Sequence, residues 1–241
     1  IPVTKAVNFY EGDWEKEQED ILTVAAGYGY PLIVKPVSLG SSIGVAIANN
    51  KDELIDAVET AFRYDEHLLI EEAVNPLMEI NCSVIGTPDD CRASVCEKPL
   101  GQTETLSFED KYQSGGSGDK GMASADRMIP ADISDELTKR IQSLATKTFA
   151  ALDASGLARL DFLINANTEE VYFNEINTIP GSFSFYLWEE SGLSFDALLE
   201  ELIEIGLKQH RKKNGRIRSY DTNLLSEKAV KGIKGLKGNK N

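Results

Sequence analysis

Two apolar segments, residues 157–165 and 171–178, constrain the fold more than any other part of the chain, because a turn-rich stretch joins them. The pattern predicts two antiparallel strands in a hairpin. Polar side chains interrupt both strands at two-residue spacing, and they are Arg159 and Asp161 in the first strand and Glu175 and Asn177 in the second. Side chains two residues apart share one face of a strand, so the members of each pair lie together.

A carboxylate in a mostly buried strand costs free energy unless it is paired or bound to a metal ion. Carboxylate and amide oxygens are ligands for hard cations, so Asp161, Glu175 and Asn177 predict a site of the Mg²⁺ type, with Arg159 beside it. A plainer interpretation stays open, in which Asp161 only pairs with Arg159 and Glu175 lies on an exposed face.

A Gly/Ser segment at 40–44 lies between two predicted strands, 32–36 and 45–48. Small residues let backbone N–H groups and hydroxyls close around phosphate, and Lys35 adds a cation at the end of the first strand. An ordinary turn would have the same pattern. Three acids lie near the ends of later predicted strands, and they are Glu71, Glu72 and Glu79. They could bind an adenine amino group and a ribose hydroxyl, although exposed acids without a ligand would show the same pattern.

Helical periodicity and capping residues predict helices over 14–28, 51–64, 134–152 and 194–213. Apolar runs predict three further strands, at 67–72, 79–85 and 93–98. This mixture indicates an α+β fold. The length of 241 residues suits one large domain or two small subdomains that share a cleft.

A polar, Gly-rich stretch at 99–131 interrupts these elements. Loops of this length in a compact domain are usually functional lids or disordered segments. The sequence favours a lid, because Lys111 and Tyr112 are followed by several glycines.

The formal net charge is −14, although residues 208–241 hold 11 Lys or Arg against Asp221 and Glu227. An acidic body argues against nucleic acid as a partner, because phosphate contacts need clustered cations. The basic tail is expected to be a mobile solubilising segment, with phosphate or partner binding as the alternative.

Three cysteines without C-x-x-C spacing predict neither a zinc site nor a disulfide scaffold. The only histidines, His67 and His210, are far apart, which argues against a histidine base. No run approaches the roughly 18–20 apolar residues of a membrane helix, so no membrane partner is expected and the predicted location is the cytoplasm.

Six motifs occur in an order that resembles the ATP-grasp ligases, and specifically the D-alanine–D-alanine ligase family. They are residues 32–36, 40–44, 69–72, 110–112, 159–161 and 174–181. The resemblance covers about residues 30–210. It implies two α+β subdomains that hold ATP between their sheets, one at 1–75 and the other at 76–213 with the lid at 99–131. The basic tail is expected to be separate, at 214–241.

The resemblance also implies the residues that bind ATP, which are Lys35, Ser41, Ser42, Glu71, Glu72, Glu79, Lys111 and Leu163. Two Mg²⁺ ions, or Mn²⁺ in their place, would be held by Asp161, Glu175 and Asn177. The implied catalytic groups are Arg159 and the N–H of Gly181 at an oxyanion, with Ser41 and Tyr112 linking the phosphate loop to the lid.

The implied reaction phosphorylates the carboxylate of one D-alanine, after which the amine of a second D-alanine displaces phosphate, for peptidoglycan precursor synthesis. Tyr186 and Leu187 occupy the positions at which the family binds the second substrate, and the family usually has Ser at the first of them. A different acceptor, such as D-serine, a D-hydroxy acid or another amino acid, is therefore an alternative. So is a nucleotide-binding fragment without turnover, because the N-terminal domain of the family is expected to be missing. A homodimer of the full-length protein is compatible with the resemblance.

Overall fold

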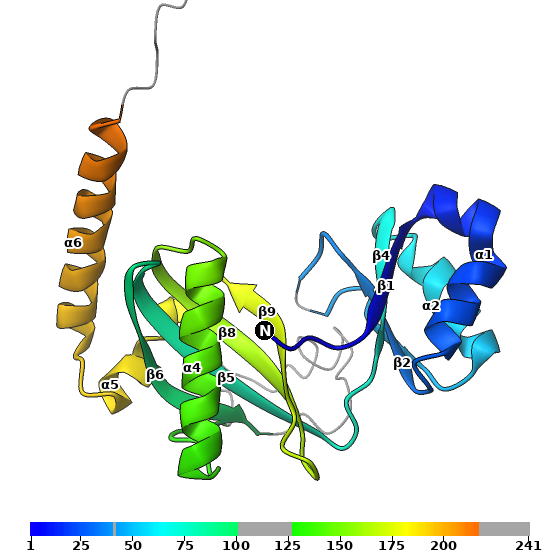
Figure 1. Ribbon diagram of the computed structural model, residues 1–241, viewed down its shortest axis with the longest axis horizontal. Coiled ribbons are helices and arrows are strands. Elements are labelled where there is room, and N and C mark those ends of the chain that lie inside the picture. Colours follow the sequence, from blue (N-terminus) through cyan, green and yellow to red (C-terminus); the bar gives the residue numbers. More distant parts are fainter. Residues whose placement is uncertain (41, 101–126, 217–241) are drawn as a thin grey trace, which may run out of the picture. The chain divides into compact units, whose positions relative to one another are not determined.

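The computed structural model describes three ranges of residues, 1–40, 42–100 and 127–216 (Figure 1). The chain forms two compact units, residues 1–202 and 203–241. The first unit contains two antiparallel sheets, and the second begins within helix α6 (Phe195–Asn214). Among the helices of the described ranges, none is long and apolar enough to cross a membrane.

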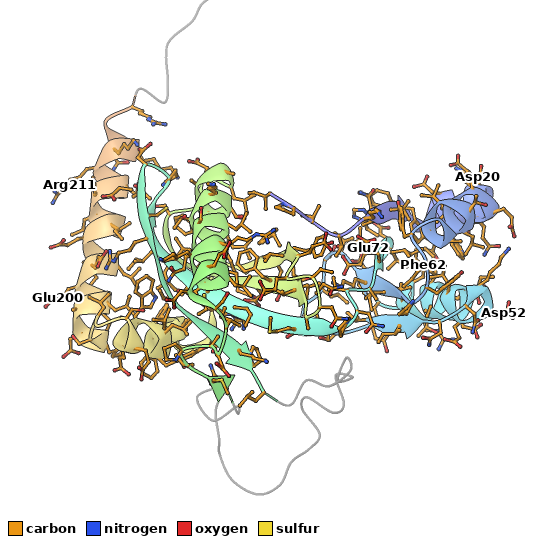
Figure 2. All side chains as sticks on the ribbon, turned by 60° about the horizontal axis from the view of Figure 1, so that its bottom comes forward. Asp20, Asp52, Phe62, Glu72, Glu200 and Arg211 are labelled. Atoms are coloured by element: carbon orange, nitrogen blue, oxygen red, sulfur yellow. The ribbon has the colours of Figure 1, made fainter. Side chains whose placement is uncertain are left out.

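The first sheet has the strand order β1-β4-β2-β3. Its strands are β1 (Ala6–Tyr10), β2 (Leu32–Pro36), β3 (Ala46–Ala48) and β4 (His67–Glu72). Helices α1 (Glu11–Ala26) and α2 (Lys51–Ala61) pack on one face of it, because alternation points the apolar side chains of β2 and β4 into a shared core. Acidic side chains on the outer faces of these helices, such as Asp20 and Asp52, point away from the core (Figure 2).

Capping explains where the helices begin. Asn50 accepts a hydrogen bond from the backbone N–H of Glu53 at 3.0 Å, which confirms the predicted start of α2. The helix ends at Ala61, three residues before the predicted end. Ser134 caps α4 (Asp135–Ala151) in the same way, by accepting from the N–H of Leu137 at 3.1 Å.

The second sheet has the strand order β7-β6-β5-β8-β9. Its strands are β5 (Leu77–Thr87), β6 (Asp90–Pro99), β7 (Arg127–Met128), β8 (Gly156–Asn165) and β9 (Val171–Asn177). Helix α4 covers one face, as Figure 1 shows, and its apolar side chains join those of β5 and β8 in a second core. A 3-10 turn, η2 (Gly181–Ser184), and the short helix α5 (Phe185–Glu190) follow β9.

A bulge in β9 decides which side chains leave the core. Asp161 pairs with Glu175, but the next residue of β8, Phe162, pairs with Phe173, so Asn174 is the extra residue of β9. The bulge reverses the alternation of side chains along β9, so Phe173 and Glu175 point to opposite faces of the sheet. Phe173 therefore packs against the core, while Glu175 lies with Asp161 on the face away from α4.

Two strands and one α-helix were not predicted from the sequence. β1 is an edge strand with only Phe9 buried, so its apolar alternation is weak. The six residues of α5 are too few to show helical periodicity. β7 is two residues long and is defined only by its pairing with β6, inside the stretch predicted as a lid.

Candidate active site

Four polar side chains form one row across the second sheet, on the face away from α4. From β6 to β9 the row consists of Glu97, Asn81, Asp161 and Glu175, each a direct cross-strand partner of the next. Direct partners in an antiparallel sheet share a face and have Cβ atoms roughly 4.5–5.5 Å apart. The register therefore gathers four polar groups that are scattered in the sequence.

Asp161 is at the centre of a hydrogen-bonded cluster. Arg159 donates from Nε and Nη2 to the two carboxylate oxygens of Asp161, each at 2.7 Å. Asn177, the cross-strand partner of Arg159, donates from Nδ2 to Asp161 Oδ2 at 2.9 Å and to Glu175 Oε1 at 3.3 Å. The four polar residues predicted from the hairpin spacing are thus brought together.

Burial and negative neighbours raise the pKa of Asp161 above its ordinary value of 3.8. Burial is the largest cause, Arg159 opposes it, and the charges of Glu175 and Glu97 raise the pKa further. Burial lowers the pKa of Arg159, but its hydrogen bonds to Asp161 and the charge of that carboxylate outweigh the burial, so the pKa is raised. An additional cation would stabilise the ionised form of Asp161.

The chemistry of this donor set fits a hard divalent cation. Asp161 offers a carboxylate whose pKa is raised in spite of Arg159, Glu175 is exposed and can be reached from solvent, and a rotated amide of Asn177 presents its oxygen. Within the described ranges, no group of three or more His, Cys, Asp or Glu side chains is placed to hold a metal ion. The candidate set therefore combines two carboxylates with one amide. The plainer interpretation also fits the structure, because Arg159 forms an ion pair with Asp161 and Glu175 is exposed.

Lys35 on β2 contacts groups from both sheets of the first unit. Its ammonium forms an ion pair with Glu71 on β4, whose carboxylate also accepts from Thr4 Oγ1 at 2.9 Å. It also donates to Oδ1 of Asn174, the bulge residue of β9, at 3.1 Å. Lys35 is therefore held on the face of its sheet that α1 and α2 do not cover.

The other residues predicted to contact nucleotide lie on β4, β5 and β8. Glu72 ends β4, where its carboxylate accepts from the backbone N–H of Lys5 at 3.0 Å. Glu79 on β5 is the cross-strand partner of Leu163 on β8, and both are half-buried. They are two residues from Asn81 and Asp161, so alternation places them on the same face as the polar row.

The Gly/Ser segment forms a tight turn. Ser42 has φ of 58°, and the N–H of Ile43 donates to the carbonyl of Gly40 at 3.1 Å. Gly44 has φ of 73°, and a Cβ there would lie 2.8 Å from Cγ of Pro36. Three predicted site residues, Ser41, Lys111 and Tyr112, lie outside the described residues.

The residues predicted after β9 lie on η2 and α5. Gly181 begins η2, which contacts β8, the strand of Arg159. Tyr186 on α5 donates from Oη to Glu97 Oε1 at 3.3 Å, so it joins the polar row. Leu187, the next residue of α5, is fully buried.

Sequence reasoning missed Glu97, Asn81 and Arg127. Glu97 is an acid within an apolar strand, the same signal that pointed to Asp161, but its partners could not be read without the strand register. Arg127 donates to Glu97 Oε2 at 3.1 Å, and its guanidinium lies 4.2 Å from the ring centre of Tyr186. No local pattern marks that contact.

Comparison with known proteins gives this arrangement a context. A family model described as "D-ala D-ala ligase C-terminus" matches residues 1–204. The D-alanine–D-alanine ligase of Thermosipho africanus is 38% identical over 202 residues, which are 84% of this chain and 53% of the relative. That of Acetivibrio thermocellus is 42% identical over 198 residues, 80% of this chain and 49% of the relative. The chain spans about half the length of the curated relatives it matches.

Two solved structures extend the comparison to the fold. The structure of the D-alanine–D-alanine ligase from Coxiella burnetii matches with a TM-score of 0.71 at 29% identity. The match covers 97% of this chain and 57% of the Coxiella burnetii chain. The structure of the VanG D-Ala:D-Ser ligase from Enterococcus faecalis matches with a TM-score of 0.70 at 32% identity. The match covers 85% of this chain and 57% of the Enterococcus faecalis chain. The α+β ATP-grasp fold expected from the sequence is thereby confirmed.

Proposed function

Because the chain belongs to the D-alanine–D-alanine ligase family and matches its C-terminal region, we propose that it carries the nucleotide-binding and catalytic part of an ATP-dependent ligase. The proposed reaction joins two D-alanine molecules through an acyl phosphate, for peptidoglycan precursor synthesis. The observation that carries this proposal is the cluster in which Asp161 meets Arg159, Asn177 and, through the row, Glu175.

Asp161, Glu175 and Asn177 would hold Mg²⁺, which supplies positive charge beside the phosphate oxygens when bound. Lys35 would contact phosphate from the opposite sheet of the same unit. Its present partners, Glu71 and Asn174, hold its ammonium in place for that contact. The lysine therefore does not have to be ordered from a freely rotating state when nucleotide binds.

Four further groups would bind the rest of the nucleotide. We propose that Glu71 and Glu72, at the end of β4, lie beside adenine, that Glu79 accepts from a ribose hydroxyl, and that Leu163 packs on the adenine ring. The pairing of Glu79 with Leu163 supports this assignment, because it puts one polar and one apolar contact side by side on the face of Asp161. Ser41, Ser42 and Lys111 are proposed to contact phosphate.

Arg159 would stabilise the oxyanion that develops when the amine attacks the acyl phosphate, together with the N–H of Gly181. Its double hydrogen bond to Asp161 fixes the plane of the guanidinium, so the donors are already oriented. Ser41 and Tyr112 are proposed to link the phosphate loop to the lid.

The second substrate would lie against Tyr186, with Leu187 behind it. One observation favours a second candidate function, in which the acceptor is not D-alanine. A phenol at position 186 changes the size and hydrogen bonding of the acceptor site, and the chain is similar to a D-Ala:D-Ser ligase structure at 32% identity. D-Serine and D-hydroxy acids are therefore included in the test.

Mass spectrometry of products tests the proposal. The chain is incubated with Mg-ATP and a mixture of D-amino and D-hydroxy acids, alongside Asp161→Asn and the exposed control Asp20→Asn. The proposal expects a dipeptide or depsipeptide from the wild type and the control but not from Asp161→Asn. Calorimetric binding of Mg-ATP without any product, in this chain and in a longer protein that contains it, would instead indicate a nucleotide-binding module.

A further inference from the structure

Glu97 is a buried carboxylate that holds donors from three different elements. Its side chain is 3% exposed. It accepts from Asn81 Nδ2 on β5 at 3.0 Å, from Arg127 Nη1 on β7 at 3.1 Å and from Tyr186 Oη on α5 at 3.3 Å. A buried carboxylate is stable only when such donors compensate its charge. The four side chains therefore form one cluster, the Glu97 cluster. None of the roles proposed above uses Glu97.

The Glu97 cluster fixes Tyr186 at two points. The hydroxyl donates a hydrogen bond to Glu97, and the guanidinium of Arg127 lies over the ring at 4.2 Å in a cation–π contact. Burial and the charge of Glu97 raise the pKa of Tyr186, while Arg127 and Arg159 oppose the shift. The phenol therefore remains a hydrogen-bond donor at neutral pH.

The Glu97 cluster is continuous with the hydrogen-bonded cluster around Asp161. Asn81 is the direct cross-strand partner of Glu97 on one side and of Asp161 on the other. The charge of Glu97 also acts on both Arg159 and Asp161. A change at Glu97 therefore alters the position of Tyr186 and the field at Arg159 without removing a ligand of the proposed metal.

We propose that Glu97 is a positioning residue of the acceptor site, which holds Tyr186 and Arg127 in the arrangement that the second substrate meets. The inference rests on the proposed function, in which Tyr186 contacts that substrate. Glu97 does not itself touch the substrate. It sets the place of the phenol ring, and hence the affinity for the acceptor acid, whereas the proposed nucleotide contacts Glu79 and Leu163 are on β5 and β8.

Steady-state kinetics of Glu97→Gln test the assignment. Loss of the charge weakens the hold on Tyr186 and Arg127, so the KM for the acceptor should rise about tenfold, while the KM for ATP changes less than about twofold. Arg127→Lys keeps the charge but loses the planar guanidinium, and should raise the acceptor KM in the same direction by less. Thermal unfolding of each variant shows whether it is folded.

Glu201→Gln is the matched control, because it breaks another carboxylate–arginine pair of β6, to Arg92 at 2.5 and 2.7 Å. It should leave both KM values unchanged. A readout without turnover is the NMR titration of ¹³C-labelled tyrosine. Glu97→Gln removes a charge that raises the pKa of Tyr186, so this pKa should fall, and Glu201→Gln should not move it.

The outcomes separate this inference from the function on which it rests. If neither this chain nor a longer protein that contains it makes a ligation product, the proposed function fails and the acceptor-site role falls with it. If the wild type is active but Glu97→Gln changes both KM values in proportion, or matches Glu201→Gln, only the positioning role is overturned. An unchanged pKa of Tyr186 in Glu97→Gln would contradict it as well.

Discussion

Arg159 and Asp161 are two residues apart on β8, and the guanidinium donates to both carboxylate oxygens at 2.7 Å. The pair links two proposed tasks, because one member would stabilise an oxyanion and the other would hold a metal ion. It also means that the carboxylate keeps a cationic partner before Mg²⁺ binds, so the buried charge is never left alone.

Replacing Asp161 tests the metal assignment. Asp161→Asn keeps the size of the side chain but loses the charge, so the affinity for Mg²⁺ in the presence of ATP should fall at least about tenfold. Titration calorimetry measures this, with Asp20→Asn as the exposed control. Equal affinity in both variants would exclude Asp161 as a ligand.

Replacing Arg159 tests the oxyanion assignment. Arg159→Lys retains the charge but not the fork that meets Asp161 bidentately, so kcat should fall by about 10²–10³. Binding of Mg-ATP should change far less. Parallel losses of ATP affinity and kcat would show that Arg159 supports the nucleotide site instead.

The raised pKa of Asp161 predicts a pH dependence. The carboxyl is protonated at a higher pH than an ordinary Asp, whose value is 3.8, so the folding free energy that it contributes is present at low pH and is lost as the pH rises through the folded pKa. Metal binding needs the ionised form. The increase in Tm on adding Mg-ATP should therefore shrink on acidification already above pH 3.8, and Asp161→Asn should remove this titration.

Glycine at position 44 is required by the turn of the Gly/Ser segment. Gly44→Ala places a Cβ at a φ of 73° and 2.8 Å from Pro36, so the free energy of unfolding should fall by about 1–2 kcal/mol. Gly40→Ala is the matched control in the same loop, because a Cβ there meets nothing within 4 Å. Denaturant unfolding compares the two, and equal stabilities would contradict the strained turn.

The sequence predicted the hairpin of β8 and β9 and its polar residues because alternation along a strand is fixed by its pleat. Arg159 and Asp161 share a face for that reason, and so do Glu175 and Asn177. Their meeting depends on the bulge at Asn174, which no local pattern shows: without it, Phe173 and Glu175 would face the same way. The spacing therefore identified the residues, and the register explains their contact.

The proposed acceptor side of the site was harder to predict from the sequence. Tyr186 was identified by its place after the motif at 174–181, but Glu97 and Arg127 reach it from strands far away in the chain. Long-range pairing decides such contacts, and it depends on register rather than on composition. The short elements β1, β7 and α5 were missed because each is stabilised by its neighbours more than by its own pattern.

The path of a carboxylate oxygen tests the central claim most directly. D-Alanine labelled with ¹⁸O in its carboxylate is supplied with Mg-ATP, and the released phosphate is analysed by mass spectrometry. If the carboxylate oxygen attacks the γ-phosphorus and the amine then displaces phosphate, each phosphate carries one oxygen from D-alanine. Unlabelled phosphate would mean that water takes the phosphoryl group, and it would contradict an acyl-phosphate ligase.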